Sequence, residues 1–204
     1  MSEHRDGNQD GHGDQHGSGR RAQRRPDVTT VELVGGVEAL RVGLHEYDDR
    51  WPDVYREHHD RIRSALTGVD ADVEHIGSTS VPGLAAKPVV DVVVAVDDVT
   101  AEEDHLDRLL AAGYELRVRE PGHRLVRTPA RDVHVHVYAR GDAAVGEYLL
   151  LRDHLRADAD DRALYERTKR ELMARDWDDT NAYADAKGEV IARIKARARE
   201  RGGR

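Results

Sequence analysis

Asp91 is the residue whose position most strongly indicates chemistry. It interrupts the run Val89–Val94, whose β-branched side chains are typical of a central strand covered on both faces. A buried, unpaired carboxylate costs on the order of several kcal/mol, so this side chain must be protonated, pair with a cation or bind a metal ion. A structural ion pair with Lys87 or with an arginine would satisfy it as well. The residues around Asp91 therefore decide between a structural and a functional role.

A glycine–serine pair precedes Asp91 in the sequence. Gly77 and Ser78 follow a predicted strand at 73–76, and twelve residues separate Ser78 from Asp91. Glycine lets a phosphate approach the backbone closely, and the hydroxyls of Ser78 and Thr79 are hydrogen-bond donors. A turn of this kind combined with an aspartate on the next strand predicts a phosphate-binding site.

Two histidines lie two residues apart on a predicted strand at 133–138. Residues i and i+2 of a strand share a face, so we expect His134 and His136 to converge with Asp91 from a neighbouring strand. One carboxylate and two imidazoles form a ligand set for a divalent ion such as Zn²⁺ or Mn²⁺, and Mg²⁺ is a third candidate. The alternatives are that the histidines contact a ligand phosphate or pair with acidic groups.

Basic residues near these elements are candidates for binding phosphate. Residues 117–131 contain five arginines against Glu120 alone, and guanidinium groups suit bidentate phosphate contacts, although a solvated hairpin would also explain the cluster. Arg124 and Arg127 are expected to face opposite ways on one strand. The chain has only four lysines, so each lysine is more informative than an arginine. The further candidates are Lys87, Arg152, Lys169 and Lys187.

Hydrophobic periodicity predicts the elements that position these residues. A helical stripe begins at Trp51 and ends near Gly68, and Thr100 and Glu103 fit a capping box that opens a helix stopping at Gly113. Strands are expected at 73–76, 89–96, 114–119, 124–128 and 133–138, with a turn at 120–123. Helices are expected at 143–157, 160–175 and 180–200, with a break at 176–179.

This layout predicts an α/β (α+β) fold, with a mixed sheet of four or five strands flanked by helices and followed by a C-terminal helical cap. Residues 1–27 are rich in glycine and nearly free of apolar side chains, which predicts a disordered tail. The folded domain is expected at 28–204, with an α/β core at about 28–140 and the cap at about 141–200. In the cap, Tyr165, Trp177 and Tyr183 are expected to pack against the core rather than to stack on a base.

Composition limits the classes of function. The 204 residues carry a formal net charge of −8, and residues 1–27 contain five acids and five arginines, so the whole charge belongs to the remainder. We therefore expect no broad nucleic-acid surface. The absence of cysteine excludes disulfides and cysteine-ligated metals. No apolar run approaches the roughly 18 residues of a membrane span, so we expect a cytoplasmic protein without a membrane partner.

The segment from His75 to Asp91 resembles the core motif of the GrpB family, also designated UPF0157. The resemblance extends from about Val31 to Arg197 and takes in Tyr47, Trp51-Pro52, 134–137, 152–156, Tyr165, Lys169 and 181–187. It implies a nucleotidyltransferase-like fold that binds a nucleotide or another small phosphorylated ligand. It also implies a link to coenzyme A metabolism, because related domains are fused to dephospho-coenzyme A kinase.

The first hypothesis is a metal-dependent nucleotidyltransferase. Its catalytic residues would be Asp91, Ser78 and Lys87, its phosphate-binding residues Gly77, Ser78, Thr79, Lys87, Arg124, Arg127, Arg152 and Lys169, and its metal ligands Asp91, His134 and His136. The superfamily usually has a second acid two residues after the first, where this chain has Val93. The alternative is therefore a non-catalytic nucleotide- or phosphate-binding module, or a protein-interaction module, on a degenerate nucleotidyltransferase fold. A metal-dependent phosphoesterase using the two histidines is a weaker third hypothesis, because no second histidine pair is evident.

Overall fold

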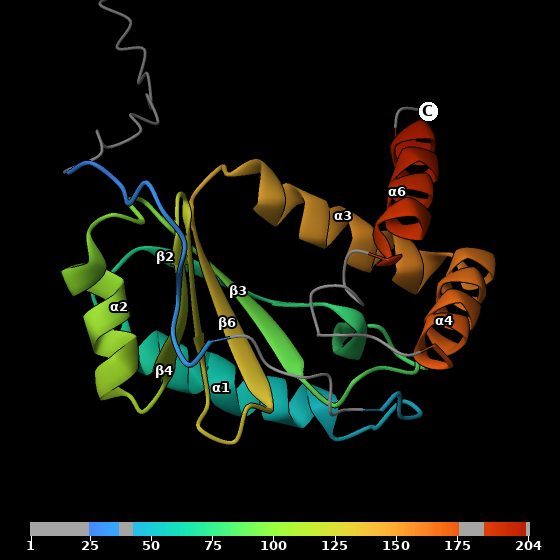
Figure 1. The fold of residues 1–204 in the computed structure, drawn as a ribbon, viewed down its shortest axis with the longest axis horizontal. Coiled ribbons are helices and arrows are strands. Elements are labelled where there is room, and N and C mark those ends of the chain that lie inside the picture. The colour runs from blue at the N-terminus through green and yellow to red at the C-terminus, as the bar shows by residue number, and fades with distance from the viewer. Residues whose placement is uncertain (1–24, 37–42, 176–185, 203–204) are drawn as a thin grey trace, which may run out of the picture.

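A computed structural model describes residues 25–36, 43–175 and 186–202 of the chain. Its centre is a mixed six-stranded sheet with the order β1-β4-β5-β6-β3-β2 (Figure 1). The strands are β1 (Glu32–Leu33), β2 (Ala71–Ile76), β3 (Val90–Val96), β4 (Glu115–Glu120), β5 (His123–Arg127) and β6 (Val133–Ala139). β3 and β6 pair in parallel, and the other neighbouring strands pair antiparallel.

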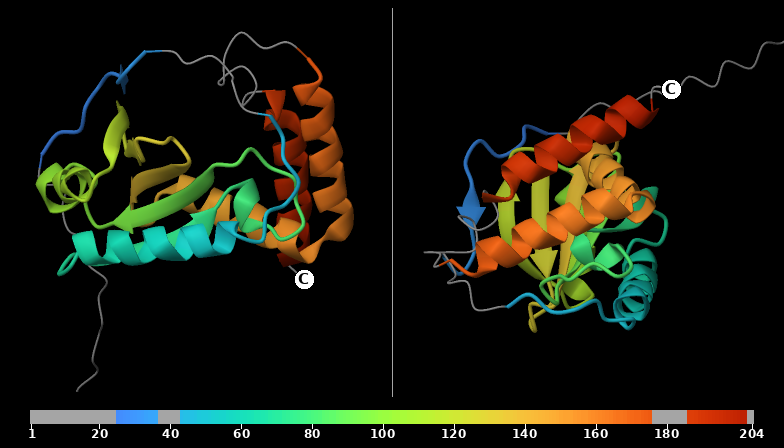
Figure 2. Two further views of the ribbon diagram at one scale, coloured as in Figure 1. Left: turned by 90° about the horizontal axis from the view of Figure 1, so that it is seen from below. Right: turned by 90° about the vertical axis from the view of Figure 1, so that its right-hand side faces the viewer.

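In the part of the chain that the structure describes, two helices cover one face of this sheet and three form the cap. The helices are α1 (Trp51–Ala65), α2 (Glu102–Ala111), α3 (Ala143–Ala157), α4 (Ala159–Met173) and α6 (Gly188–Gly202), with a short 3₁₀ helix η1 (Ser78–Ser80). In Figure 2, α4 and α6 lie side by side beyond the sheet. The α/β architecture with a helical cap is confirmed, and β1 extends the sheet beyond the predicted strands.

Alternation along the strands builds the main core. Val90, Val92 and Val94 of β3 and Val133 and Val135 of β6 all point toward α1 and α2 and are at most 2% exposed. Because successive side chains of a strand point to opposite faces, the intervening Asp91, His134 and His136 are presented on the other face. The pattern that buries the valines therefore places all three candidate ligands on one surface.

A second apolar cluster joins the segment after η1 to the cap. Val81 and Leu84 are fully buried, and they pack with Leu155 of α3, Tyr165 of α4 and Ile194 of α6. Tyr165 therefore lies in the core, as expected. Trp177, Tyr183, the predicted break at 176–179 and the start of the predicted helix at 180–200 lie outside the described residues. The consequence for function is that the Gly77–Ser78 turn is held against the cap by packing.

The predicted capping box is wrong. The hydroxyl of Thr100 donates to Asp98 Oδ1 at 2.6 Å, and the N-cap position of α2 is Ala101, which makes no side-chain cap hydrogen bond. A threonine hydroxyl can satisfy a neighbouring side chain instead of a helix terminus, and here Asp98 competes successfully for it. α2 consequently starts at Glu102 rather than at the threonine.

Glu102 is instead used to bind arginines. Its carboxylate accepts hydrogen bonds from Arg124 at 2.6 Å and from Arg119 at 2.9 Å. Arg124 is 1% exposed and also donates to Asp27 Oδ1 at 2.6 Å. Asp27, which the sequence places in the predicted tail at 1–27, is therefore tied to the core, whereas residues 1–24 of that tail lie outside the described residues. Within the described ranges, no helix is long and apolar enough to cross a lipid bilayer.

Replacing Arg124 should destabilise the fold. Arg124→Ala leaves Glu102 and Asp27 without their buried cation, and removing one partner of a buried ion pair costs about 3–5 kcal/mol. Urea unfolding should show this loss, whereas Arg193→Ala, on an exposed position of α6, should change the free energy of unfolding by less than about 0.5 kcal/mol. Equal stabilities for the two variants would contradict the structural role of Arg124.

Candidate functional site

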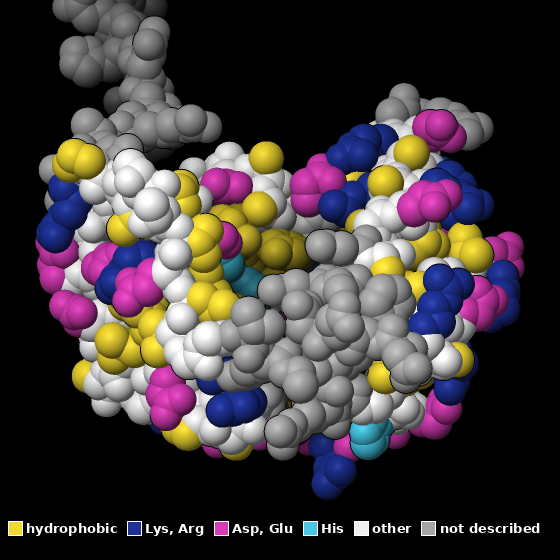
Figure 3. Space-filling model, in the orientation of Figure 1, with side chains coloured by type: hydrophobic (Ala, Val, Ile, Leu, Met, Phe, Trp, Pro, Cys, Tyr) yellow, Lys and Arg dark blue, Asp and Glu magenta, His cyan; other side chains and the backbone are white. Residues whose placement is uncertain are grey.

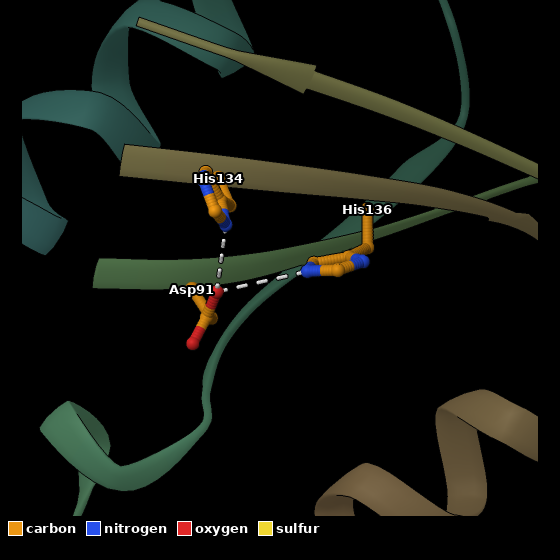
Figure 4. A group of neighbouring side chains, drawn as sticks. All are labelled: Asp91, His134 and His136. Atoms are coloured by element: carbon orange, nitrogen blue, oxygen red, sulfur yellow. Dashed lines mark ion pairs between the residues drawn. The ribbon is translucent and has the colours of Figure 1, made fainter. Parts of the chain in front are cut away.

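Asp91, His134 and His136 converge on the face of the sheet opposite α1 and α2. Oδ1 of Asp91 lies 3.6 Å from Nδ1 of His134 and 3.6 Å from Nε2 of His136 (Figure 4). The two histidines project from β6 toward the carboxylate on the parallel neighbour β3, where Asp91 pairs with His134 in register. One ligand atom from each residue lies within 4.8 Å of the other two. The convergence predicted from the strand spacing is therefore present.

Gly77 makes room for the Asp91 carboxylate. Its φ is +71°, and a Cβ at this position would lie 2.5 Å from Oδ2 of Asp91. A side chain would thus meet both an unfavourable backbone conformation and a steric clash. The serine of the pair is positioned at the same time, because the hydroxyl of Ser80 donates to the carbonyl of Gly77 at 2.6 Å and closes the turn.

The two histidines determine the charge state of Asp91. Burial alone would raise the pKa of this carboxyl group, but its interactions with His134 and His136 outweigh burial and hold the pKa well below its usual range. Asp91 is therefore an anion at neutral pH. Its side chain is 29% exposed, so the carboxylate borders on space that a ligand can enter.

A pocket of about 190 Å³ opens beside this carboxylate. It is lined by Ser78, Thr79, Lys87, Val89, Asp91, His134, Lys169 and Lys187. Three of the chain's four lysines thus border a single pocket, although they come from the loop before β3, from α4 and from the segment before α6. Figure 3 shows the molecule hollowed between the sheet and the cap, with a histidine side chain visible in the hollow. The pocket is therefore cationic at its rim, with Asp91 at its wall.

Lys169 is the most buried of the three lysines. It is 2% exposed, and its Nζ donates to Ser78 Oγ at 3.1 Å and to the carbonyl of Ala85. Burial and, to a smaller extent, the charge of Lys187 lower the pKa of Lys169 to about 7. The ammonium also lies 4.7 Å from the ring centre of Tyr165. Lys169 is therefore held against Ser78, and burial makes it easier for its ammonium group to lose a proton.

The pKa values of the other two lysines of the pocket are lowered as well. Burial lowers the pKa of Lys87, and the nearby Asp91 opposes this shift. Burial also lowers the pKa of Lys187, where Asp91 again opposes it and Lys87 reinforces it. Three ammonium groups close together repel one another, so an anion bound among them would stabilise their charged forms.

The ligand chemistry of the Asp91 group fits one divalent metal ion. Two imidazole nitrogens and one carboxylate oxygen suit Zn²⁺ or Mn²⁺ better than Mg²⁺, which prefers oxygen ligands. Val93, the position of the usual second acid, is 1% exposed and cannot add a carboxylate. Opposite it on β2 lies Glu74, which is bound by Arg152 at 2.7 Å. Among these residues, the set of ligands matches a single ion rather than a pair.

The structure corrects the expectation for Arg124. This side chain points to the face covered by α2, where Glu102 and Asp27 bind it, and does not reach the pocket. Sequence periodicity placed Arg124 and Arg127 on opposite faces but could not say which face holds the ligand site.

The other phosphate candidates differ in their surroundings. Arg127 is buried. It pairs with His134 across β5 and β6, so it lies on the face of the sheet that carries the pocket, but it does not line the pocket. Arg152 donates to Glu74, Asp153 and the carbonyl of His75, so carboxylates occupy much of its donor capacity. Thr79 lines the pocket, and its hydroxyl is hydrogen-bonded to His75 at 3.1 Å.

The sequence did not single out His75 and His123, which are hydrogen-bonded to the site residues Thr79 and His136. His75 stacks on Tyr55 of α1 with ring centres 4.6 Å apart, and burial lowers its pKa to about 4, so it is neutral. His123 is a hydrogen-bond partner of His136, with His123 Nε2 3.2 Å from His136 Nδ1. The only available signals were the position of His75 at the start of the resembling motif and the position of His123 beside a turn.

Comparisons of the sequence with known proteins find one protein family and several similar proteins. A family profile described as GrpB protein matches residues 41–197. A UPF0157 protein of Streptomyces coelicolor is 72% identical over 176 residues, which cover 86% of this chain and 94% of that protein. A dephospho-CoA kinase of Mycolicibacterium paratuberculosis is 30% identical over 169 residues, which cover 69% of this chain and 42% of that protein.

Solved structures of similar fold include one that the family profile's description also names. The crystal structure of the conserved protein GrpB from Enterococcus faecalis matches with a TM-score of 0.70 and 28% identity, covering 79% of this chain and 100% of that chain. The structure of a GLD-2/RNP-8 complex matches with a TM-score of 0.51 and 16% identity, covering 72% of this chain and 60% of that chain, and this likeness concerns the fold alone. The fold is nucleotidyltransferase-like, as the resemblance implied. The chain belongs to the GrpB family.

Proposed function

We propose that this protein binds the phosphate groups of a nucleotide or another small phosphorylated ligand among Lys87, Lys169 and Lys187. In this proposal Asp91, His134 and His136 hold one divalent ion beside those groups. The observation that carries the proposal is that three of the chain's four lysines line the same pocket as two of these metal-ligand candidates. A chain with a net charge of −8 has no general reason to gather its few lysines in one place.

The size of the pocket favours phosphate groups over a whole nucleotide. Its volume of about 190 Å³ is below the roughly 300 Å³ at which pockets for drug-sized ligands begin. The phosphates would lie among the lysines with Ser78 as a further donor, and the rest of the ligand would extend into the hollow between the sheet and the cap. This arrangement suits a compact anion better than a long polyanion.

The reaction that this arrangement supports best is nucleotidyl transfer. An acceptor hydroxyl would attack the α-phosphorus of a nucleoside triphosphate and release its proton to solvent. The bond from the α-phosphorus to the oxygen that bridges it to the β-phosphorus would break, and pyrophosphate would leave. The bound metal ion would supply Lewis-acid polarisation of the phosphoryl oxygens. Lys87 and Lys169 would balance the negative charge that develops on the leaving pyrophosphate, and Asp91 would hold the ion in place.

A second candidate function is ligand binding without catalysis. Val93 stands where a second acid would bind another metal ion, and its side chain is 1% exposed. Glu74, the nearest acid across the strand pair, is bound to Arg152. A nucleotide sensor or a protein-interaction module on this fold would need the lysines and Ser78 but not the metal ligands. The effect of a chelator distinguishes the two candidates.

Coenzyme A precursors belong among the ligands to be tested. A dephospho-CoA kinase contains a region that resembles this chain, and such precursors carry phosphate groups of the size that the pocket admits. These precursors are therefore candidate ligands, whereas kinase activity belongs to the whole of that relative and does not follow from one similar region.

A nucleoside triphosphate together with Mn²⁺ should raise the melting temperature of the protein. At a ligand concentration of about 100 times Kd, binding stabilises the folded state by about 2.7 kcal/mol, which corresponds to about 5–10 °C for a chain of this size. Asp91→Asn should abolish the metal-dependent part of this shift, and Asp107→Asn, on an exposed position of α2, should retain it. A shift that persists with a chelator would favour the non-catalytic candidate, and no shift with any of the four common nucleoside triphosphates would contradict nucleotidyl transfer.

Anion binding should weaken as Lys169 loses its proton. Because burial lowers the pKa of Lys169 to about 7, the free pocket loses a positive charge as the pH rises through this value. Sulfate, which does not titrate in this range, should bind more weakly at about pH 8.5 than at about pH 6, by as much as about tenfold per pH unit above the pKa.

Isothermal titration calorimetry with two lysine variants tests this assignment. Lys169→Arg keeps a permanent charge and should flatten the pH dependence. Lys195→Arg is the matched control, because Lys195 pairs with Glu147 and does not line the pocket. The role of Lys169 would be disproved if the arginine variant showed the same pH dependence as the unaltered protein.

A further inference from the structure

A row of three side chains ends on the candidate metal ligand His136. Glu120 Oε1 lies 2.6 Å from His123 Nδ1, and His123 Nε2 lies 3.2 Å from His136 Nδ1. The other nitrogen of His136, Nε2, faces Asp91 Oδ1 at 3.6 Å. The row crosses β4, β5 and β6, and Asp91 on β3 continues it, so residues from four strands meet in one line of polar atoms.

Aromatic packing fixes the orientation of the middle ring. His123 is 8% exposed, and its ring lies nearly parallel to Tyr138, at 12° with centres 4.4 Å apart. It is also nearly parallel to His136, at 9° with centres 5.3 Å apart. Tyr148 of α3 lies against His136 with ring centres 5.9 Å apart. These contacts hold the planes of both imidazoles, and the hydrogen bonds between Glu120 and His123 and between His123 and His136 hold the nitrogens beside their partners.

The positions of the protons follow from this geometry. A histidine binds a metal ion through a nitrogen lone pair, and Nε2 of His136 is the nitrogen that faces Asp91. The proton of His136 must then be on Nδ1, where it is donated to Nε2 of His123. His123 in turn carries its proton on Nδ1 and donates it to the carboxylate of Glu120. One set of tautomers satisfies all four ring nitrogens.

We propose that His123 and Glu120 are positioning residues of the metal site, which hold His136 in its ligating tautomer and raise its electron donation to the ion. The inference rests on the metal site of the proposed function. A metal-bound histidine commonly donates its second N–H to a carboxylate, a carbonyl or water, and loss of this partner typically weakens metal affinity about 10–100-fold. Here a second histidine relays that interaction to the carboxylate.

Two substitutions interrupt the row in different ways. His123→Phe keeps an aromatic ring against Tyr138 but removes both nitrogens. Glu120→Gln keeps the size of a half-exposed side chain and removes only its charge, so this variant is expected to fold even if His123→Phe does not. Tyr138→Phe is the matched control, because it preserves the stacking and loses only a hydroxyl that lies 3.5 Å from Tyr148.

Co²⁺ is the probe, because its visible absorption reports the geometry and identity of its ligands. We expect His123→Phe to lower Co²⁺ affinity about 10–100-fold and to alter the absorption bands, with a smaller loss for Glu120→Gln and no change for Tyr138→Phe. Thermal unfolding without metal shows whether a variant is folded, and a purely structural role would change that unfolding without changing the spectrum of the bound ion.

The possible failures are distinguishable. Unaltered affinity and spectra in both His123→Phe and Glu120→Gln would overturn the positioning role while leaving the metal site intact. Co²⁺ binding that survives Asp91→Asn unchanged, or no Co²⁺ binding by the unaltered protein, would overturn the metal site and this inference with it. Phosphate binding by the three lysines would not be affected by that result, because the sulfate titration tests it separately.

Discussion

The negative charge of Asp91 in the middle of a valine-rich sheet is the constraint on which the rest of the site depends. The strand can bury Val90, Val92 and Val94 only by presenting Asp91 on the opposite face, and a carboxylate there requires cations or polar partners. His134 and His136 provide those partners from the parallel neighbour strand. Gly77 leaves the space that the carboxylate occupies.

The helical cap contributes the pocket residues that the sheet does not provide. Val81 and Leu84 anchor the segment after Ser78 to α3, α4 and α6, and the same contact brings Lys169 to Ser78 and Ala85. The glutamate Glu166, one turn away from Lys169 on α4, accepts a hydrogen bond from the amide of Ala85 at 3.1 Å. Packing between cap and core therefore also sets the distance between the lysines and the metal ligands. The geometry of the pocket therefore depends on the packing of the second apolar cluster.

Much of this arrangement could be predicted from the sequence, because it depends on the two-residue period of a strand. That period placed Asp91, His134 and His136 on a common face, and the run of valines identified the central strand. Thr100 shows a limit of local rules, since Asp98 satisfied its hydroxyl and the helix began later. Arg124 shows another, because periodicity separates two faces without saying which one α2 covers.

Long-range contacts account for what the sequence could not predict. Lys87, Lys169 and Lys187 are separated by up to a hundred residues, and only the docking of the cap makes them neighbours. His123 lies beside a turn, where no periodicity marks a side chain as functional, and its role depends on a diagonal contact with His136 across two strands. The fold class follows from local patterns, whereas the chemistry of the pocket follows from tertiary packing.

The most direct test of the central claim, that one pocket holds both a metal ion and phosphate, is anomalous X-ray diffraction from crystals grown with Mn²⁺ and a non-hydrolysable nucleoside triphosphate. We expect one anomalous peak beside Asp91 Oδ1, His134 Nδ1 and His136 Nε2, about 2.0–2.3 Å from each ligand atom, with phosphate density between that peak and Lys169. A Mn²⁺ peak away from these three residues, or phosphate density outside the three-lysine pocket, would contradict it.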